Sequence, residues 1–346
     1  MRKRVTILAL VLCLTLTACG GGEDSRGQTS FLGAAAGIQE DAVLLTVDGR
    51  EVLAWRYLYW LAYTCDRVRE RYEENGLKLD WDTPLGGGTL ADYARDQALA
   101  DTALYATVEN WAERYDCGLT GEDQIALDED WTEKAADHGG EEAYLEILAD
   151  MGLDQARAKE LSGVGQMYAK LYALSNTADS ALAPDREALE EFAAEQGLLT
   201  VDRILVSAGA DKEAARRRAA EIFSQLNSAA DQTAKFTELA AAGDDTTGPR
   251  TLSPGDGVLD TSLEEAAGTL AEGQCSGILE SGEGFSILLR LPTAPESVSA
   301  GYFDQRLQSA AEGAAVETAE EYGKLDIAGF YRSLQAVRAA DHNTIS

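Results

Sequence analysis

The spacing of apolar residues changes twice along the chain, and that change constrains the fold more than any other sequence feature. Between residues 55 and 172, apolar side chains recur every three or four positions, the period of a helix with one buried face. Two runs of another kind follow, TVDRILV at 200–206 and FSILLRL at 285–291, and these favour β-strands. Helical spacing returns between residues 302 and 337. The pattern predicts helical segments on either side of a mixed α and β region.

The first helical region opens with a hairpin signal and a helix-start signal. VLLTVDGREV at 43–52 places an Asp-Gly turn pair between two apolar runs. Thr89 followed by Asp92 indicates the start of a long helix, and Gly118 indicates its end. The apolar stripes of these helices would suit a peptide or cofactor groove, but a packed core is the interpretation we favour.

The mixed region, residues 199–293, shows the order strand, helix, helix, loop, helix, strand. Residues 212–226 carry their apolar side chains on one helical face, and FTELA at 236–240 starts a second short helix. The Pro/Gly-rich segment GPRTLSPGDG predicts a loop, and residues 263–270 a third helical piece. This order predicts a small sheet flanked by helices.

The first residues indicate export. MRKRVTILALVLCLTLTAC begins with basic residues, continues as an apolar run too short to span a bilayer, and ends in LTAC, which matches the bacterial lipobox. We expect a signal peptide at 1–18, cleavage between Ala18 and Cys19, and acylation of Cys19. Residues 19–40 are rich in Gly, Ser and Ala, which predicts a flexible lipoprotein tether.

Length and charge narrow the classes of function. A chain of 346 residues is long enough for about two domains. It has 60 acidic and 29 basic residues, a formal net charge of −31, which argues against nucleic acid as a partner. Anionic headgroups would repel so acidic a body, so we expect contact with the membrane through the lipid anchor.

Residues for nucleophilic or metal chemistry are sparse. Once the signal peptide and the lipidated cysteine are set aside, the thiols are Cys65, Cys117 and Cys275, and the histidines are His138 and His342. No CxxC spacing and no His-containing cluster is present in the sequence, so we expect no metal, no cofactor and no catalytic triad. A disulfide between Cys65 and Cys117 is left open.

The order of motifs over residues 42–175 resembles the helical chaperone module of SurA-like and PrsA-like exported foldases. VDGREVLAWRYLYWL leads to a helix that ends in WAERYDCGLTGEDQ, and GGEEAYLEILADMGLDQARAKEL follows. The resemblance implies a helical chaperone segment over residues 41–195. In this family a C-terminal segment packs back on the N-terminal module, which implies the same for residues 299–346.

Residues 199–293 resemble the parvulin-type peptidyl-prolyl isomerase domain. Its patterns His-Ile-Leu-Val, Phe-x-x-Leu-Ala, Pro-Gly, Gly-Glu-x-Ser-x-Pro-Val and Gly-x-His-Ile-Ile are matched, in that order, at 203–206, 236–240, 254–255, 273–279 and 284–288. The resemblance implies a parvulin-like domain inserted between two halves of one helical lobe. The expected fold class is therefore mainly α with an inserted α+β domain.

The departures from the parvulin pattern fall on the residues that would do the chemistry. Arg203 and Ser286 stand where the family has its two histidines, and residues 247–250 replace its Gly-Gly-Asp-Leu-Gly approach, so that an acidic or thiol residue has no secure match. Hydrogen bonds in such a site favour the twisted amide, so losing both histidines predicts weak or lost isomerase activity. Candidates for the pocket that would hold a substrate proline are Leu263, Leu252 and Phe285.

These resemblances imply a membrane-anchored folding factor that faces outside the cytoplasm and binds unfolded or proline-containing exported polypeptides. An active peptidyl-prolyl cis-trans isomerase is one alternative. A surface lipoprotein that binds a solute or a polymer is another. The clients and the oligomeric state are left open by the sequence.

Overall fold

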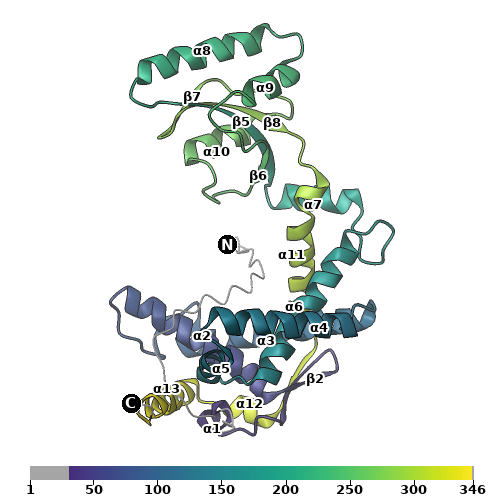
Figure 1. Cartoon of the computed structure of the whole chain (residues 1–346), viewed down its shortest axis with the longest axis vertical. Helices are drawn as coiled ribbons and strands as arrows, with labels where there is room; N and C mark the ends of the chain where they lie inside the picture. Colours follow the sequence, from purple (N-terminus) through teal and green to yellow (C-terminus); the bar gives the residue numbers. More distant parts are fainter. Residues whose placement is uncertain (1–30, 345–346) are drawn as a thin grey trace. The chain divides into compact units, whose positions relative to one another are not determined.

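The structure is a computed structural model that describes residues 31–344. The expected signal peptide and the lipidation site at Cys19 lie outside the described residues. The chain forms two compact units, one from the residues up to Leu182 together with those from Asp304 onward, and the other from Ala183–Phe303. The second unit is inserted in the sequence of the first, and the first is largely helical (Figure 1). The predicted fold class, mainly α with an inserted α+β domain, is confirmed.

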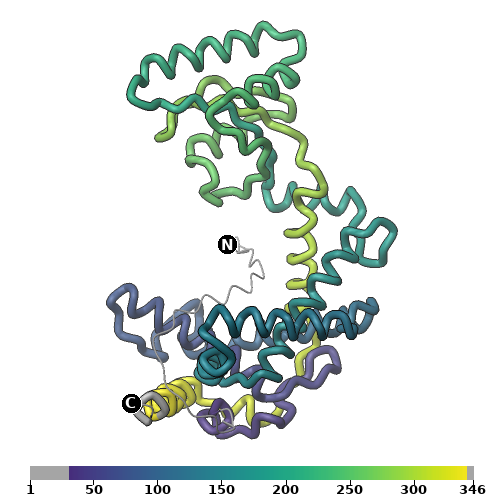
Figure 2. The backbone as a smooth tube through the Cα atoms, in the orientation of Figure 1, coloured from purple at the N-terminus to yellow at the C-terminus, as the bar shows by residue number. Residues whose placement is uncertain are grey.

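A small sheet joins the two ends of the helical unit. Strands β1 (Val43–Val47) and β2 (Arg50–Leu53) form the predicted hairpin, whose two turn residues both have positive φ, 49° and 84°. Strand β9 (Val316–Thr318) pairs with the other edge of β1. Figure 2 shows this late, yellow segment beside the early, purple one. The C-terminal segment therefore completes the fold of the N-terminal one.

Helices α2 (Ala54–Glu74) and α3 (Leu90–Arg114) pack on each other in the centre of this unit. The Thr89 side chain accepts a hydrogen bond from the Asp92 N–H, and the Asp92 carboxylate accepts one from the Thr89 N–H, which confirms the predicted helix start. The end differs from the prediction at Gly118, because Asp116 already takes the left-handed conformation with φ 55°. The other elements are β3 (Pro84–Leu85), β4 (Gly88–Thr89), α4 (Gly121–Asp137), α5 (Glu141–Asp150), α6 (Gln155–Ser175), α11 (Ser299–Glu312), α12 (Glu320–Lys324) and α13 (Ile327–Thr344). Of α11, the residues from Asp304 onward belong to this unit.

Residues 31–40 are part of the helical unit and not of the tether expected at 19–40. Helix α1 (Leu32–Ala36) packs against α13 and α2, and the Leu32 side chain is fully buried. Glu40 accepts a hydrogen bond from the Gly33 N–H at 2.8 Å and forms an ion pair with Arg157 at 2.8 Å. The Gly- and Ala-rich composition suggested flexibility, but one buried leucine and one ion pair fix this segment.

Asp66 of α2 fastens the last helix to the unit. The guanidinium of Arg338 donates to both carboxylate oxygens of Asp66 at 2.9 Å, and the Tyr331 hydroxyl donates to the same carboxylate at 2.8 Å. Arg69 in turn donates to the Tyr331 hydroxyl at 2.9 Å. A bidentate pair of this kind is among the stronger charge-assisted contacts. The C-terminal helices thus pack on the N-terminal helical lobe, as the fold class predicts.

The second unit is built on a four-stranded antiparallel sheet in the order β6-β5-β8-β7. Two long neighbouring strands form its centre and carry the expected apolar runs. The GPRTLSPGDG segment, predicted as a loop, contributes the edge strand β6 because Leu252 pairs with Leu199. The elements are α7 (Arg186–Glu195), β5 (Leu199–Ser207), α8 (Lys212–Ser228), α9 (Gln232–Ala240), β6 (Arg250–Leu252), α10 (Thr261–Thr269), β7 (Leu279–Glu280), β8 (Gly284–Leu291) and the 3₁₀ turn Pro295–Ser297.

Helices cover both faces of this sheet. Helices α8 and α9 lie on one face and α10 lies on the other (Figure 1). Helix α7 packs with Val298 through Leu189 and Phe192, and therefore belongs to the second unit. The expected helical chaperone segment extended to residue 195, whereas the N-terminal part of the helical unit ends at Leu182. The spacing of apolar residues in α7 is the same as in the other helices, so the sequence did not show which unit this helix packs against.

Candidate functional site

The pleat of the sheet brings Arg203 and Ser286 onto the same face. In the pairing of β5 with β8, Arg203 lies opposite Leu288 and Ser286 lies opposite Leu205. Residues opposite each other share a face, as do residues two apart on one strand, so Arg203 and Ser286 are diagonal neighbours. Leu288, which shares their face, packs against α10, so Arg203 and Ser286 lie on the face of the sheet that α10 covers. The two positions that depart from the parvulin pattern therefore form one local site.

Arg203 is held by carboxylates from two loops. Its Nε donates to Asp245 Oδ2 at 2.7 Å, and its Nη1 donates to Glu283 Oε2 at 2.6 Å. Arg250 of β6 donates to the same Asp245 oxygen at 2.6 Å, and the Thr247 N–H donates to the other oxygen at 3.0 Å. The side chains of Arg203 and Asp245 are only 8% and 6% exposed. The guanidinium is thus fixed in place and does not reach into solvent.

The electrostatics of this network favour its charged form. Burial works against the charge of Asp245, but donation by the Thr247 N–H and by two guanidinium groups holds the pKa of its carboxyl well below the usual range. Burial also opposes the charge of Arg203, whose pKa is nevertheless raised by the hydrogen bonds to Glu283 and Asp245. For the adjacent Asp202, burial raises the pKa. The Arg203–Asp245 pair is therefore a stable ion pair at neutral pH.

Ser286 has no room to act on a substrate. Its side chain is fully buried between Leu205 and Leu279 of the flanking strands. Its hydroxyl has no hydrogen-bond partner among the described residues. A small buried hydroxyl supplies neither the reach nor the two ring nitrogens of a histidine.

The three candidate pocket residues do not line one pocket. Leu252 and Leu263 are 2% and 0% exposed and pack into the core between the sheet and α10. Phe285 lies on the opposite face, in the core under α8 and α9. Because successive residues of a strand point to opposite faces, Phe285 cannot share a face with Ser286. These side chains are therefore packing residues rather than the walls of an open cup.

The sequence alone did not predict the residues that bind Arg203. Asp245 is 42 positions away in the sequence and Glu283 is 80 positions away. The available signals were an Asp-Asp pair just after the second short helix and a glutamate in the turn before the last strand. Neither signal says which arginine it meets, because that depends on the register of β5 with its neighbours.

Other residues singled out in the sequence have structural environments. Cys65 and Cys117 are buried and carry free thiols, so the disulfide left open by the sequence is not formed. His138 follows the last turn of α4, and its ring stacks on Tyr144 at 5.2 Å. Within residues 31–344, three or more His, Cys, Asp or Glu residues are nowhere grouped to hold a metal ion. The helices described are each too short or too polar to cross a membrane.

Comparison with known proteins gives similarities among solved structures only. No protein-family model matches the chain, and no curated protein sequence matches it. PrsA from Bacillus subtilis is similar at 15% identity, with 87% of this chain and 93% of that chain covered and a TM-score of 0.26. The foldase protein PrsA from Streptococcus pneumoniae is similar at 14% identity, with 86% and 94% covered and a TM-score of 0.27.

A SurA-like chaperone of Campylobacter jejuni is also similar, at 11% identity, with 81% of this chain and 99% of that chain covered and a TM-score of 0.24. These are proteins of the kind that the sequence motifs resemble. TM-scores of 0.24 to 0.27 do not establish a shared fold. The proposals that follow therefore rest on the residues of this chain.

Proposed function

We propose that this chain is an exported, lipid-anchored folding factor that binds unfolded polypeptides through its helical unit and has weak or no prolyl isomerase activity. The observation that carries the proposal is the fixation of Arg203 by Asp245 and Glu283 beside the buried Ser286. The face of the sheet that would hold a parvulin site is thus occupied by an internal ion-pair network.

An isomerase must stabilise the twisted amide more than the planar one. It does so by holding the proline ring in an apolar cup while hydrogen-bond donors meet the rotating peptide group. Here the Leu252 and Leu263 side chains belong to one buried core cluster and are 2% and 0% exposed, so neither is open to a ligand. The Nε and Nη1 donors of Arg203 already bind the carboxylates of Asp245 and Glu283. The second unit therefore lacks both an open apolar cup for the proline ring and donors of Arg203 at Nε and Nη1 that are available to the rotating peptide group.

The helical unit offers the surface that a weak chaperone needs. It exposes several large apolar side chains, among them Leu77 at 59%, Leu85 at 48%, Tyr93 at 45% and Tyr63 at 37%. Exposed apolar side chains can make weak, reversible contacts with the apolar segments of unfolded chains, without covalent steps. The net charge of −31 keeps such a surface soluble and favours cationic clients.

The proposed location follows from the N-terminal motif. LTAC ending at Cys19 supports lipid anchoring at a membrane, with the protein body on the side to which the signal exports it. Two or more acyl chains on one cysteine would give stable anchoring, which a single chain does not.

Suppression of aggregation tests the chaperone activity. The soluble chain without residues 1–19 is added to a chemically unfolded client that aggregates on dilution, and light scattering is followed. We expect scattering to fall as the protein approaches equimolar amounts. A chain that leaves scattering unchanged but shows a sharp thermal shift with one small solute would contradict the proposal and favour the solute-binding lipoprotein.

A further inference from the structure

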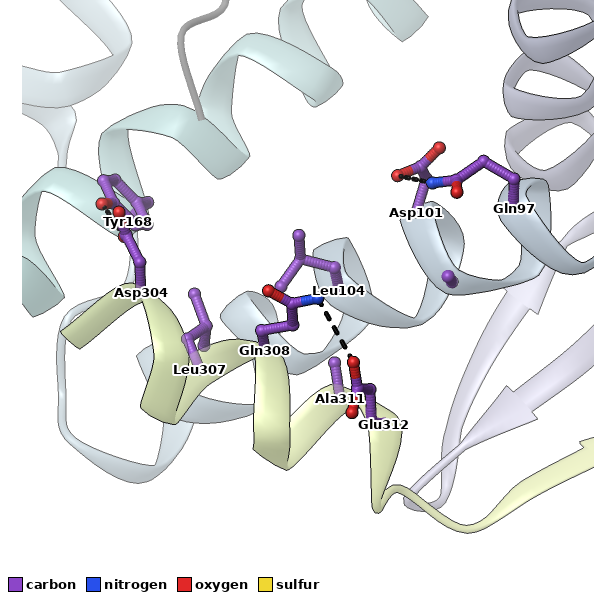
Figure 3. Close-up of a pocket in the computed structure, with 10 residues that line it drawn as sticks. Gln97, Asp101, Leu104, Tyr168, Asp304, Leu307, Gln308, Ala311 and Glu312 are labelled. Atoms are coloured by element: carbon purple, nitrogen blue, oxygen red, sulfur yellow. Dashed lines mark hydrogen bonds between the residues drawn. The ribbon is translucent and has the colours of Figure 1, made fainter. Parts of the chain in front are cut away.

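The helical unit contains a small cavity that is separate from the Arg203 network. It has a volume of about 110 Å³ and lies between α3, α6 and the part of α11 that follows Phe303. Figure 3 shows side chains of these three helices around it. The lining residues are Gln97, Ala100, Asp101, Leu104, Tyr168, Asp304, Leu307, Gln308, Ala311 and Glu312.

The lining combines an apolar floor with an acidic rim. Leu307 and Ala311 are buried, and Leu104 is half-buried beside them. Carboxylates come from both sides, Asp101 from α3 and Glu312 from α11. None of the described lining residues is basic. The cavity therefore offers apolar contact at its base and negative charge around it.

Neutral donors hold these carboxylates in position. Gln97 Nε2 donates to Asp101 at 3.2 Å, and Gln308 Nε2 donates to Glu312 at 3.2 Å. The Tyr168 hydroxyl donates to Asp304 (Figure 3). Burial raises the pKa of Asp101 and of Asp304, which means that each carboxylate would gain from a cation brought close to it.

The side of α3 that lines the cavity also carries Tyr93. Tyr93, Gln97, Asp101 and Leu104 are spaced by four, four and three residues, so they lie on one side of the helix. Tyr93, two turns before Asp101, is 45% exposed. An extended segment lying along α3 would meet apolar or aromatic side chains before and after the acidic position.

We propose that this cavity binds a lysine or arginine side chain of an unfolded polypeptide, with the apolar neighbours of that residue lying along α3. The proposal rests on the proposed chaperone function, because it names the kind of client segment that the helical unit takes. A volume of about 110 Å³ is well below the roughly 300–1,000 Å³ of small-molecule pockets, so one side chain is the better occupant.

A basic side chain matches both parts of the lining. Its aliphatic stem would cover Leu104 and Leu307, and its charged head would reach Asp101 and Glu312. Binding of a metal ion instead is not supported, because within residues 31–344 no group of three suitable ligands is placed to hold one. The charge complementarity therefore selects a cationic peptide segment.

Peptide binding tests the proposal. The probe is the fluorescein-labelled peptide Ser-Val-Leu-Thr-Lys-Thr-Leu-Val-Ser, and two matched peptides carry norleucine or glutamate in place of the lysine. Affinities for the soluble chain are measured by fluorescence anisotropy. We expect the lysine peptide to bind about threefold to tenfold more tightly than the norleucine peptide, the effect of a charge-assisted hydrogen bond at a half-exposed site. The glutamate peptide should bind most weakly.

Variants locate the preference. The pair Asp101→Asn and Glu312→Gln removes two charges at the cavity and should abolish the preference for lysine. The pair Glu129→Gln and Glu133→Gln removes two exposed charges from α4 of the same unit and should leave it intact. Ala100→Phe, an exposed position at the cavity, should weaken binding of the lysine peptide without changing helicity.

Each contrary result has a distinct meaning. Equal binding of the lysine and norleucine peptides would overturn this proposal, even if aggregation is suppressed and the chaperone function stands. A preference that survives Asp101→Asn with Glu312→Gln, or that is lost equally in the α4 control, would also overturn it. Failure to bind any of the three peptides, together with no suppression of aggregation, would instead contradict the proposed function itself.

Discussion

Replacing Arg203 by methionine should destabilise the second unit. The change keeps most of the aliphatic volume but removes the guanidinium from a pair whose side chains are 8% and 6% exposed. Removing one partner of a buried pair commonly costs about 3–5 kcal/mol. Arg250 and the Thr247 N–H still contact Asp245 in the variant, so we expect a loss somewhat below this range, about 2–3 kcal/mol.

Two optical signals report this change separately. The five tryptophans, Trp55, Trp60, Trp81, Trp111 and Trp131, all lie in the helical unit, so their emission follows that unit alone. Far-ultraviolet circular dichroism follows both units. In urea denaturation, Arg203→Met should therefore lower the dichroism-detected free energy of unfolding and leave the tryptophan-detected transition in place.

A neighbouring exposed pair supplies the control. Arg218 contacts Asp244 at 3.3 Å, and its side chain is 48% exposed. Arg218→Met should change stability by at most about 1 kcal/mol, the range for exposed pairs. A loss for Arg203→Met no larger than for Arg218→Met would refute the claim that the buried Arg203–Asp245 pair stabilises the second unit.

Acid should remove the same stabilisation. Because the pKa of Asp245 is lower in the folded state than in the unfolded chain, its contribution is fully present above about pH 4 and declines as the pH falls below that value. Between about pH 6 and pH 3 the native chain should lose more stability than Arg203→Met does. An equal loss of stability in the native chain and in Arg203→Met would show that the pair with Arg203 does not lower the pKa of Asp245.

Four further changes test other parts of the account. Ser286→Ala removes a buried hydroxyl that has no partner, so the free energy of unfolding should stay the same or rise by up to about 1 kcal/mol in urea titration, and a clear loss would contradict its being unpaired. Leu32→Ala creates a cavity at a fully buried site and should lower the tryptophan-detected free energy of unfolding by about 2–4 kcal/mol. No change would instead indicate that residues 31–40 belong to the tether and do not pack on the helical unit. Gly284→Ala would place a Cβ 2.3 Å from the Val206 carbonyl oxygen at a φ of 146°, so the dichroism-detected stability should fall by about 3 kcal/mol or more. Cys19→Ser should move the protein from the membrane fraction to the soluble one in cell fractionation, and continued membrane association would contradict lipid anchoring.

Local signals in the sequence predicted local structure well. The Thr89 and Asp92 pair forms the reciprocal cap that its spacing indicates, because all of its atoms lie within one turn. The Asp48-Gly49 pair adopts the two positive φ values that a tight hairpin needs. The alternation of strand and helix signals likewise predicted the order of elements in the second unit.

Features that depend on distant partners were not predictable from one sequence. The composition around Leu32 resembles a linker, and only its burial against α13 shows otherwise. Phe285 was expected beside the site, but the pleat places it on the opposite face from Ser286. Arg203 could be marked as a departure from the family pattern, while Asp245 and Glu283 became its partners only through the arrangement of loops around the sheet.

The refolding rate of a client limited by one slow prolyl bond tests the central claim most directly. Uncatalysed exchange of such a bond takes tens to hundreds of seconds, so catalysis is easily seen. With about one molecule of this protein per hundred clients, the account predicts little or no change in the rate, and at equimolar amounts it predicts slower refolding because the unfolded client is bound. A severalfold acceleration at the catalytic ratio, in proportion to the amount of protein added, would contradict the account.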